Sequence, residues 1–459
     1  MQFNALKNMR VAILGAGREG QSVWRQMRRR FPRKHLSLFS EAPVDEFFVK
    51  VLNPALDDLH VGPLDTARLR QFDVLVRSAG ISPYRDELKE LRSLGLQFTT
   101  ASNLWFAENP EARTICISGT KGKSTTAALT THLLSQAGVK TCLAGNIGKP
   151  MLDCDDVNVD WWVIELSSYQ ISDLRARPDI VVLLNLSDEH VDWHLNAKNY
   201  RSDKLRLARL VEDGRLIANA SDVALQKEFS GHSNVRWFNQ AGQWQAGESH
   251  VVRQTHGIEK ADKQAECSIT PSRLAAPVSL PGEHNMQNLA AALTVCEELG
   301  VNFPHLNEAL STFRGLPHRL QLIGTKAGVR YVDDSISTTP VSVEAALQAT
   351  GYADVVLILG GMDRGLDWTC FAKGIREETP YSIITVPDNG PNISACLKEA
   401  GVKPEGGLHA LPGLREAVLL AQTLVPDNGC VLLSPGAPSF PHFVNFEDRG
   451  RMFKRYAGL

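Results

Sequence analysis

The chain has 459 residues, of which 43% are hydrophobic and 22% charged, and its formal net charge is −2 at pH 7. This length predicts two to four domains, and the composition is typical of a globular protein. The balanced charge gives no electrostatic reason to expect nucleic acid or an anionic membrane as a partner. Because no stretch resembles a signal peptide or reaches the length of a membrane span, we expect a cytoplasmic protein.

The eight cysteines are scattered along the chain, and none of them belongs to a Cys-x-x-Cys pair. Several stand within apolar runs, as buried thiols do. The pattern predicts reduced cysteines in the core and argues against a disulfide framework or a zinc site.

The first region is predicted to be a Rossmann-like unit. Residues 10–14 form an apolar strand, residues 15–20 read Gly-Ala-Gly-Arg-Glu-Gly, and a helical pattern runs to residue 30. By itself this turn suits a dinucleotide, a diphosphate or no ligand, and it does not decide among them. A second small-residue turn, at residues 78–83, follows a strand predicted at 74–77. Two such turns at one edge of a sheet favour a bound diphosphate group.

A phosphate-binding loop opens the middle region. The apolar strand at 115–118 leads into Gly119-Thr-Lys-Gly-Lys-Ser-Thr125, and a helical pattern follows. Backbone N–H groups of such a turn and of the new helix surround an anion, Lys123 neutralises phosphate charge, and the Ser124 hydroxyl suits Mg²⁺. Ile117 stands where the longer Walker A pattern has its first glycine. The alternative is a plain strand–turn–helix, but the agreement of turn, lysine and hydroxyl favours a nucleoside triphosphate site.

Polar residues follow two further strands of the middle region. Glu165 ends the strand predicted at 161–166, and a carboxylate among apolar neighbours is costly without a cation nearby. A Mg²⁺ ligand is therefore favoured over a salt-bridged edge residue. His190 follows the strand predicted at 181–185, at the same edge of the sheet, where ligands of parallel sheets bind. Lys204 lies in a predicted helix, and its local pattern indicates only a solvated charge.

The later regions continue the alternation of strands and helices. Asn285 and Asn288 lie three residues apart near a helix start, where they either cap the helix or contact a purine edge. Strands at 329–332, 355–359, 383–386 and 431–433 indicate one more α/β unit. We therefore predict an α/β chain of three consecutive domains with mainly parallel sheets and an active site between them. The N-terminal domain (1–108) is Rossmann-like, the central one (109–314) P-loop ATPase-like, and the C-terminal one (315–459) Rossmann-like.

Together these motifs resemble the Mur ligase family, in the family's order and over nearly the whole chain. The stretches that carry the resemblance are Gly119–Thr125, Gly145-Asn-Ile-Gly148, Glu165-Leu-Ser-Ser-Tyr-Gln170, Asp188-Glu-His190, Tyr200-Arg-Ser-Asp-Lys204, Leu280-Pro-Gly-Glu-His-Asn285, Gly315-Leu-Pro-His-Arg319, Asp334-Ser335, Leu433-Ser-Pro435 and Phe446-x-x-Arg-Gly450. Within the family, the chain looks like the MurD type, which joins glutamate to UDP-N-acetylmuramoyl-L-alanine for peptidoglycan synthesis. That activity serves cell-wall biogenesis, cell shape and division.

The resemblance implies that ATP phosphorylates the carboxylate of the UDP-linked substrate, and that the amine of glutamate then attacks the acyl phosphate. It implies Lys123, Glu165, His190 and Lys204 as catalytic residues. Ser124, Glu165 and His190 are the implied Mg²⁺ ligands, with two ions bound. It also implies a carbamylated lysine at position 204 and a monomer that binds no nucleic acid.

The resemblance also assigns binding residues to each substrate. For ATP they are Gly119, Thr120, Lys121, Gly122, Lys123, Ser124, Thr125, Asn285, Asn288, Arg319 and Asp334. For the UDP-linked substrate they are Arg18, Glu19, Ser40, Glu41, Ser78, Gly80, Asn146, Ser167 and Tyr200. For glutamate they are Thr338, Arg364, Ser439 and Phe446.

Two departures bear on the stereochemistry of the amino acid. Ile336 and Arg364 stand where ligases specific for D-glutamate commonly have lysines, and Arg does not present its charge as Lys does. We therefore favour the branch of the family that adds L-glutamate, with D-glutamate as the alternative. More remote alternatives are an NAD-binding oxidoreductase, a folylpolyglutamate synthase and a regulator without catalysis.

Overall fold

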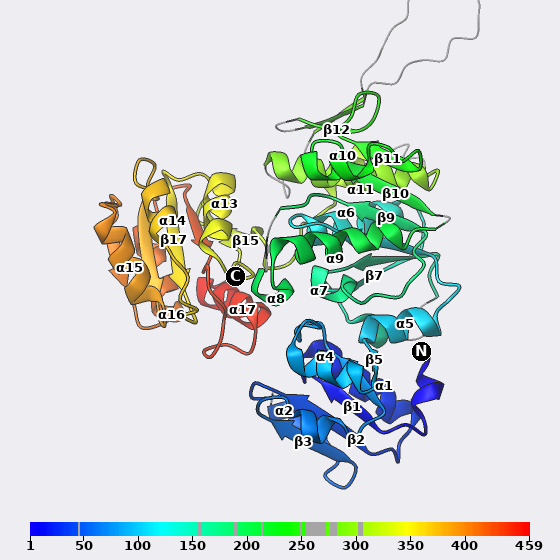
Figure 1. Cartoon of the computed structure of the whole chain (residues 1–459). Helices are drawn as coiled ribbons and strands as arrows, with labels where there is room; N and C mark the ends of the chain where they lie inside the picture. Colours follow the sequence, from blue (N-terminus) through cyan, green and yellow to red (C-terminus); the bar gives the residue numbers. More distant parts are fainter. Residues whose placement is uncertain are drawn as a thin grey trace, which may run out of the picture. The chain divides into compact units, whose positions relative to one another are not determined.

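A computed structural model describes residues 1–44, 46–154, 158–187, 189, 191–212, 214–247, 250–253, 282–301 and 306–459, and the backbone of 272–275. The chain forms two compact units (Figure 1). Unit 1 is made of Met1–Ala275 and Glu283–Leu310, and unit 2 mainly of Ser311–Leu459. Within the described ranges, no helix is long and apolar enough to cross a membrane.

The first sheet of unit 1 is parallel and has the strand order β3-β2-β1-β4-β5. Its strands are β1 (Val11–Leu14), β2 (Leu36–Ser40), β3 (Asp57–Val61), β4 (Val74–Arg77) and β5 (Gln97–Thr99). Its principal helices are α1 (Arg18–Arg30), α2 (Glu46–Val51), α3 (Thr66–Leu69) and α4 (Asp86–Ser93), and α5 (Ala101–Glu108) follows. Strand β1 is buried along its whole length, as its apolar run predicts.

The second sheet of unit 1 is also parallel, with the order β11-β10-β9-β6-β8-β7. Its strands are β6 (Thr114–Ser118), β7 (Thr141–Gly145), β8 (Trp161–Glu165), β9 (Ile180–Leu183), β10 (Arg215–Asn219) and β11 (Val235–Phe238). Its helices are α6 (Lys123–Gln136), α7 (Ser168–Ile171), α8 (Val191–His194), α9 (Ala197–Arg209), α10 (Val223–Phe229) and α11 (Glu283–Glu298). A small antiparallel sheet adds β12 (Gln245–Ala246), β13 (His250–Arg253) and β14 (Ser272–Ala275).

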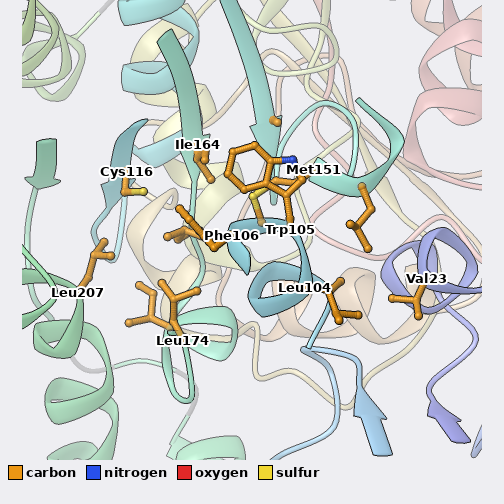
Figure 2. Close-up of a cluster of buried hydrophobic side chains, with 14 of the residues drawn as sticks. Val23, Leu104, Trp105, Phe106, Cys116, Met151, Ile164, Leu174 and Leu207 are labelled. Atoms are coloured by element: carbon orange, nitrogen blue, oxygen red, sulfur yellow. The ribbon is translucent and has the colours of Figure 1, made fainter. Parts of the chain in front are cut away.

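One hydrophobic cluster joins the two sheets of unit 1 (Figure 2). Helix α5 supplies Trp105, whose ring lies 4.9 Å from that of Trp162 in β8. Val23 of α1 and Leu104 of α5 belong to the same cluster. Because these side chains are removed from water together, burial stabilises the two sheets as one unit.

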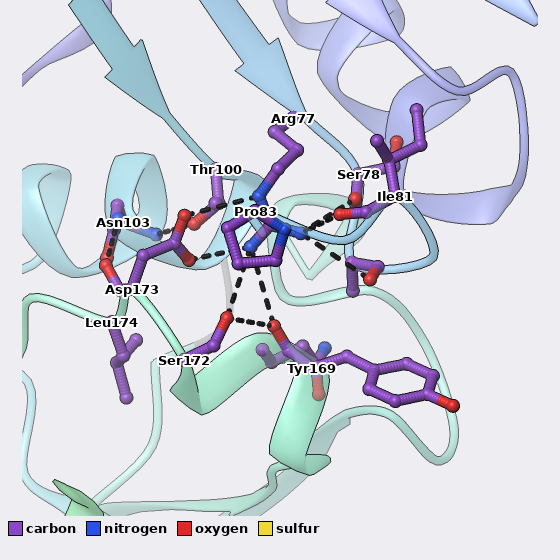
Figure 3. A network of polar contacts seen from close by, with 12 residues as sticks. Arg77, Ser78, Ile81, Pro83, Thr100, Asn103, Tyr169, Ser172, Asp173 and Leu174 are labelled. Carbon is purple, nitrogen blue, oxygen red and sulfur yellow. Dashed lines mark hydrogen bonds and ion pairs between the residues drawn. The ribbon is translucent and has the colours of Figure 1, made fainter. Parts of the chain in front are cut away.

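A buried arginine also ties the first sheet to the second (Figure 3). Arg77, at the end of β4, is fully buried. Its Nη2 lies 2.7 Å from Asp173 Oδ1, and its Nη1 donates to the Ile81 carbonyl at 2.5 Å. Further bonds reach the carbonyl of Tyr169 and the hydroxyl of Ser172. The guanidinium therefore fixes the loop after β4 against α7.

Unit 2 has one sheet with the order β15-β16-β20-β17-β18-β19, in which only β15 runs antiparallel to its neighbour. The strands are β15 (Gln321–Lys326), β16 (Val329–Asp333), β17 (Val355–Gly360), β18 (Ser382–Val386), β19 (Leu408–Ala410) and β20 (Cys430–Leu433). The helices are α12 (Leu306–Ser311) at the boundary, α13 (Pro340–Thr350), α14 (Thr369–Gly374), α15 (Gly390–Glu399), α16 (Leu414–Leu424) and α17 (Phe446–Ala457). Separate hydrophobic clusters lie on its two faces. The predicted α/β class with mainly parallel sheets is confirmed.

The cysteine prediction needs one correction. The described thiols are all free, and four of them are buried. Cys370 is instead exposed, because it lies in the first turn of the short helix α14, on the side away from the sheet. Cys267 lies outside the described residues.

Candidate active site

The phosphate loop joins β6 to α6 as predicted. Gly122 caps the helix with φ +82°, a left-handed conformation that glycine adopts without strain. A Cβ at this position would lie 2.2 Å from Asn288 Oδ1. Position 122 therefore requires glycine for two reasons, the left-handed backbone conformation and the close approach of α11 to the loop.

The loop is held by its own lysine and by a neighbouring helix. Lys123 Nζ donates to the carbonyls of Gly119 at 3.0 Å and Thr120 at 2.9 Å. Thr120 Oγ1 lies 2.8 Å from the Tyr200 hydroxyl and 3.0 Å from the Ser187 carbonyl oxygen. Tyr200, a predicted contact of the UDP-linked substrate, is fully buried and binds the loop.

The remaining loop residues face in different directions. Lys121 is exposed and forms an ion pair with Glu189, while its backbone N–H donates to Asn185 at 2.8 Å. Ser124 is half-buried and Thr125 is buried, both in the first turn of α6. The first N–H groups of a helix have no partner within the helix and form the positive end of its dipole, which favours an anion at this turn.

Glu165 has the surroundings of a cation ligand. It ends β8 and is fully buried. Its Oε1 accepts a hydrogen bond from Asn146 Nδ2 at 2.7 Å, and its Oε2 has no hydrogen-bond partner among the described residues. A buried carboxylate oxygen without a partner is costly, and a divalent cation would satisfy it. Asp188 and His190 lie outside the described residues, so the predicted role of His190 stays a prediction.

Lys204 is not the solvated charge that its local sequence indicates. Helix α9 buries this side chain to 3% exposure, and its Nζ donates to the Gly119 carbonyl at 2.8 Å. Burial, together with the charge of Lys123, holds the pKa of Lys204 well below its ordinary value. The local pattern misses this because the partners of Lys204 come from a distant part of the chain.

Lys123 and Lys204 both line one small pocket beside the phosphate loop. Its volume is about 40 Å³, and it is lined by Thr120, Lys123, Ser167, Ser168, Tyr169, Glu189, Tyr200 and Lys204. The structure thus brings Lys123 of the loop, Lys204 of α9 and the carboxylate of Glu189 together at the carboxyl edge of the second sheet.

A polar network beside Lys204 was not predicted. His194 is fully buried, with Nδ1 2.7 Å from Asp203 Oδ2 and Nε2 3.0 Å from Ser168 Oγ. The Tyr84 hydroxyl donates to Asp203 at 2.8 Å. The signal that could have revealed it is the acidic residue next to Lys204, on the same buried side of α9.

Ser167 contributes to local structure in addition to its predicted substrate role. It caps α7 and forms a reciprocal capping box with Gln170. The following Tyr169 ring stacks on Trp193, with centroids 4.2 Å apart. These two contacts hold the start of α7 in place.

The predicted UDP-site residues of the first sheet already have protein partners. Arg18 donates to the Gly148 carbonyl, and Glu19 accepts from the Ala79 N–H at 2.9 Å and from Gln170 Nε2 at 2.7 Å. The other four contacts are those of Ser40 with the Ala42 carbonyl, Glu41 with Arg85, Ser78 with the Gly15 carbonyl, and the Gly80 carbonyl with the Trp193 indole. The contacts of Arg18, Glu19 and Gly80 therefore join the first sheet to the second, whereas those of Ser40, Glu41 and Ser78 stay within residues 1–108.

Asn285 and Asn288 lie beside the phosphate loop. Asn288 Nδ2 donates to Asn285 Oδ1 at 3.2 Å, and Asn288 Oδ1 accepts from Thr126 Oγ1 at 3.2 Å. Both amides are buried. The structure brings them to the start of α6, next to Gly122.

In unit 2, Asp334 is a buried carboxylate at the end of β16. Its oxygens accept from Ser434 Oγ at 2.8 Å and from the Leu320 N–H at 3.2 Å. Burial raises the pKa of Asp334 to about 7, although these hydrogen bonds and the charge of the exposed Arg319 oppose the shift. The two predicted nucleotide contacts of this unit thus interact with each other.

The predicted glutamate contacts occupy several loops of unit 2. Thr338 and Phe446 are half-buried, Ser439 is buried, and Arg364 is exposed. Ile336, at the position of the missing lysine, is half-buried. Thr338, Arg364 and Ser439 lie in the loops that follow the carboxyl ends of β16, β17 and β20, and Phe446 begins α17.

Comparison with known proteins identifies the family. The model of the Mur ligase middle domain matches residues 117–296. A relative from Xanthomonas euvesicatoria pv. vesicatoria (strain 85-10), named UDP-N-acetylmuramoyl-L-alanine--L-glutamate ligase, is 41% identical over 476 residues, covering 100% of this chain and 97% of the relative. The chain belongs to the Mur ligase family.

Other Mur ligases agree with this assignment. A relative of the same name from Xylella fastidiosa (strain 9a5c) is 39% identical over an alignment that covers 100% of this chain and 97% of the relative. The solved structure of MurC from Thermotoga maritima has a TM-score of 0.60 at 17% identity, covering 98% of this chain and all of that one. MurF from Thermotoga maritima, solved with ADP, has a TM-score of 0.57 at 16% identity, covering 98% and 95%. These two structures show the shared fold.

Proposed function

We propose that this protein is an ATP-dependent ligase that joins L-glutamate to UDP-N-acetylmuramoyl-L-alanine in peptidoglycan synthesis, releasing ADP and phosphate. The observation that carries the proposal is the small pocket at the phosphate loop, which Lys123, Lys204 and Glu189 line. The buried Glu165, whose Oε2 has no hydrogen-bond partner among the described residues, ends a neighbouring strand of the same sheet. The full-length similarity to proteins of that name supports the choice of substrates.

The chemistry requires two anions to react. The loop N–H groups and Lys123 would hold the ATP phosphates, and the carboxylate of the UDP-linked substrate would accept the γ-phosphoryl group. Phosphorylation turns the carboxylate into an acyl phosphate, whose carbonyl carbon the glutamate amine attacks as phosphate leaves. Preorganised positive charge at the transferring phosphoryl group stabilises this kind of transition state.

Mg²⁺ fits the residues present. Ser124, Glu165 and His190 are the proposed ligands of two ions, and the open oxygen of Glu165 is the observation that supports them. When bound, the ions neutralise charge on the phosphates and on the attacking carboxylate. Asn146 holds the other Glu165 oxygen and so orients the carboxylate.

Lys204 is the proposed site of carbamylation. Its amine is buried beside Lys123 and donates to the Gly119 carbonyl, so the side chain is already fixed at the loop. Addition of CO₂ to the uncharged amine forms an N–C bond with loss of a proton, and it gives the side chain a negative charge. Intact mass of the native protein in bicarbonate, compared with that of Lys204→Arg, tests this assignment. A free amine at saturating bicarbonate would contradict it.

The other assignments complete the proposal. The sheet of residues 1–108 would bind the UDP-linked substrate through its glycine-rich turns, residues 109–314 would bind ATP, and residues 315–459 would bind glutamate. We further propose a cytoplasmic monomer.

L-glutamate is preferred to D-glutamate because Ile336 and Arg364 replace two lysines. An isoleucine offers no charge to a carboxylate, and a planar guanidinium approaches one in another geometry. The names of the relatives, which specify L-glutamate, support the same choice.

One assay tests the function. Phosphate release from ATP is measured with UDP-N-acetylmuramoyl-L-alanine and either L- or D-glutamate. We expect release with L-glutamate. Release with neither isomer would overturn the ligase proposal, and release with D-glutamate alone would overturn the stereochemical choice.

A further inference from the structure

Three side chains form a chain of hydrogen bonds that ends at the wall of the small pocket. Asp203 Oδ2 lies 2.7 Å from His194 Nδ1, and His194 Nε2 lies 3.0 Å from Ser168 Oγ. His194 is fully buried, and Ser168 lines the pocket beside the phosphate loop. An acid, an imidazole and a hydroxyl joined in this order allow the hydroxyl oxygen to take up a proton as it passes its own to the imidazole.

The carboxylate of Asp203 fixes the direction of these hydrogen bonds. The Tyr84 hydroxyl lies 2.8 Å from both oxygens of Asp203 and donates to them, so the carboxylate acts as an acceptor. It therefore also accepts the Nδ1–H of His194. In the neutral imidazole the other nitrogen then carries no hydrogen, and its lone pair accepts the O–H of Ser168. The Ser168 oxygen retains lone pairs that can accept a proton from the pocket.

We propose that Ser168 and His194 carry the proton that the glutamate amine loses when it attacks the acyl phosphate, and that Asp203 stabilises the imidazolium that forms. This role rests on the proposed function. A bond forms between the glutamate nitrogen and the acyl carbon, and the bond from that carbon to the phosphate oxygen breaks. The nitrogen gives one proton to Ser168 Oγ as the Ser168 proton moves to His194 Nε2.

The proton then returns from His194 through Ser168 to the departing phosphate. The uncharged amine and the acyl phosphate thus give the amide and hydrogen phosphate, with no proton left on the protein. Because His194 is fully buried, solvent does not take the proton before the phosphate receives it.

The other charged or hydroxyl side chains of the pocket wall are held by other protein groups. They are Lys123 and Lys204, which donate to loop carbonyls, Tyr200, which bonds with Thr120, Ser167, which bonds with Gln170, and Glu189, which pairs with Lys121. Among the described residues of this wall, Ser168 is the one whose hydroxyl is hydrogen-bonded to an imidazole. Imidazole is the side chain best suited to exchange a proton near neutral pH.

The place of Ser168 along the chain fits this role. It directly follows Ser167, a proposed contact of the UDP-linked substrate, and both residues line the pocket together with Lys123 of the phosphate loop. A substrate carboxylate that reaches the ATP phosphate from the side of Ser167 would become an acyl phosphate next to the Ser168 oxygen.

The test separates formation of the acyl phosphate from its reaction with glutamate. The full-length protein is mixed with ATP, Mg²⁺, UDP-N-acetylmuramoyl-L-alanine and L-glutamate, and rapid quenching measures ADP and amide in the first turnover. Ser168→Ala should form ADP at the wild-type rate and amide about 100-fold more slowly, the loss typical of a missing proton-transfer group. His194→Gln should show the same split, because glutamine cannot take up the proton. The KM for glutamate should stay unchanged in both variants.

Two controls address a merely structural role. Ser172→Ala removes a hydroxyl that donates to the Tyr169 carbonyl at 2.9 Å, directly after α7, and should leave both rates unchanged. Tyr84→Phe removes the hydrogen bond between the loop after β4 and Asp203 but keeps the contacts among Asp203, His194 and Ser168. Its amide formation should therefore fall much less than that of Ser168→Ala.

The possible results are distinguishable. Equal losses of ADP and amide formation in Ser168→Ala would show that the hydroxyl only supports the fold of the site, and they would overturn the proton path. Amide formation at the wild-type rate would overturn it as well. A wild-type protein that forms neither ADP nor amide would overturn the proposed function, and the proton path with it.

Discussion

Substitution of Gly122 by alanine should damage ATP binding, and its cost can be worked from the structure. The residue has φ +82°, which costs an L-residue about 1–2 kcal/mol. The new Cβ would also lie 2.2 Å from Asn288 Oδ1 and 3.1 Å from its Cγ, so one side must retreat by about 1 Å.

Asn288 has little freedom to retreat. It is 5% exposed and is held by Thr126 at 3.2 Å and Asn285 at 3.2 Å. Loss of these two bonds adds roughly 1 kcal/mol each, so Gly122→Ala should destabilise unit 1 by about 3–4 kcal/mol. Since the loop N–H groups move with the start of α6, kcat/KM for ATP should fall by roughly 100-fold.

A matched control comes from the other end of the same helix. Gly138 has φ +81°, but a Cβ there meets nothing within 4 Å. Gly138→Ala should therefore cost only the conformational part, about 1–2 kcal/mol, and should leave KM for ATP unchanged. The double variant Gly122→Ala/Asn288→Ala relieves the clash and should recover part of the stability that Gly122→Ala loses.

The measurements are urea unfolding and the initial rate of phosphate release at varied ATP. If Gly122→Ala and Gly138→Ala lose equal stability and both keep the wild-type KM, the contact with Asn288 has no energetic weight and the reasoning fails.

Three further predictions concern buried charges. Glu165→Gln should abolish Mg²⁺-dependent phosphate release. The midpoint of its thermal unfolding without metal should stay equal or rise, because the substitution removes a buried charge with a partnerless oxygen. A clear fall in that midpoint would contradict this prediction. Asp334 binds its proton more tightly in the folded protein, where its pKa is about 7 against an ordinary 3.8, so its contribution to stability is fully present below about pH 4 and is lost as the pH rises to about 7. Asp334→Asn should therefore flatten the pH dependence of the free energy of unfolding between these values, by a few kcal/mol in order of magnitude. An unchanged slope would refute this prediction. Arg77→Met should cost about 3–5 kcal/mol, whereas Arg10→Met at an exposed pair should cost about 0–1, and equal losses in urea unfolding would show that burial of the pair is irrelevant.

The sequence predicts those parts of the site that depend on neighbours along the chain. The phosphate loop can be predicted because strand, glycines, lysine and helix follow one another along the chain. Glu165 can be predicted as a ligand because it ends an apolar strand. The sequence marks only one member of the network of Tyr84, Asp203 and His194, the acidic Asp203 next to Lys204. The partners of Asp203 come from the loop after β4 and from α8, and they meet it only through folding. Strand β3 was missed for another reason: its Asp57-Asp-Leu-His sequence lacks the apolar pattern of the buried strands.

The burial of Lys204 shows why a local pattern can give the wrong role. As a helix position it reads as solvated, yet folding places its amine at the Gly119 carbonyl beside a second lysine. The spacing of residues does not indicate a role at the loop for Lys204, and only the resemblance to the family implies one.

The charges around the pocket favour a carbamylated Lys204 together with bound divalent cations in the proposed reaction. Burial first, and then repulsion by the charge of Lys123, lower the pKa of Lys204, although Glu165 opposes the shift. Loss of the Lys204 charge relieves that repulsion but leaves the Glu165 oxygen without a partner. A carbamate at Lys204 would add a second anion beside Glu165, and two divalent cations would then be needed to balance the pocket, the ATP phosphates and the substrate carboxylate. Carbamylation and metal binding should therefore depend on each other: Glu165→Gln should lower the carbamylated fraction of Lys204 in bicarbonate, and Lys204→Arg should weaken the dependence of turnover on Mg²⁺.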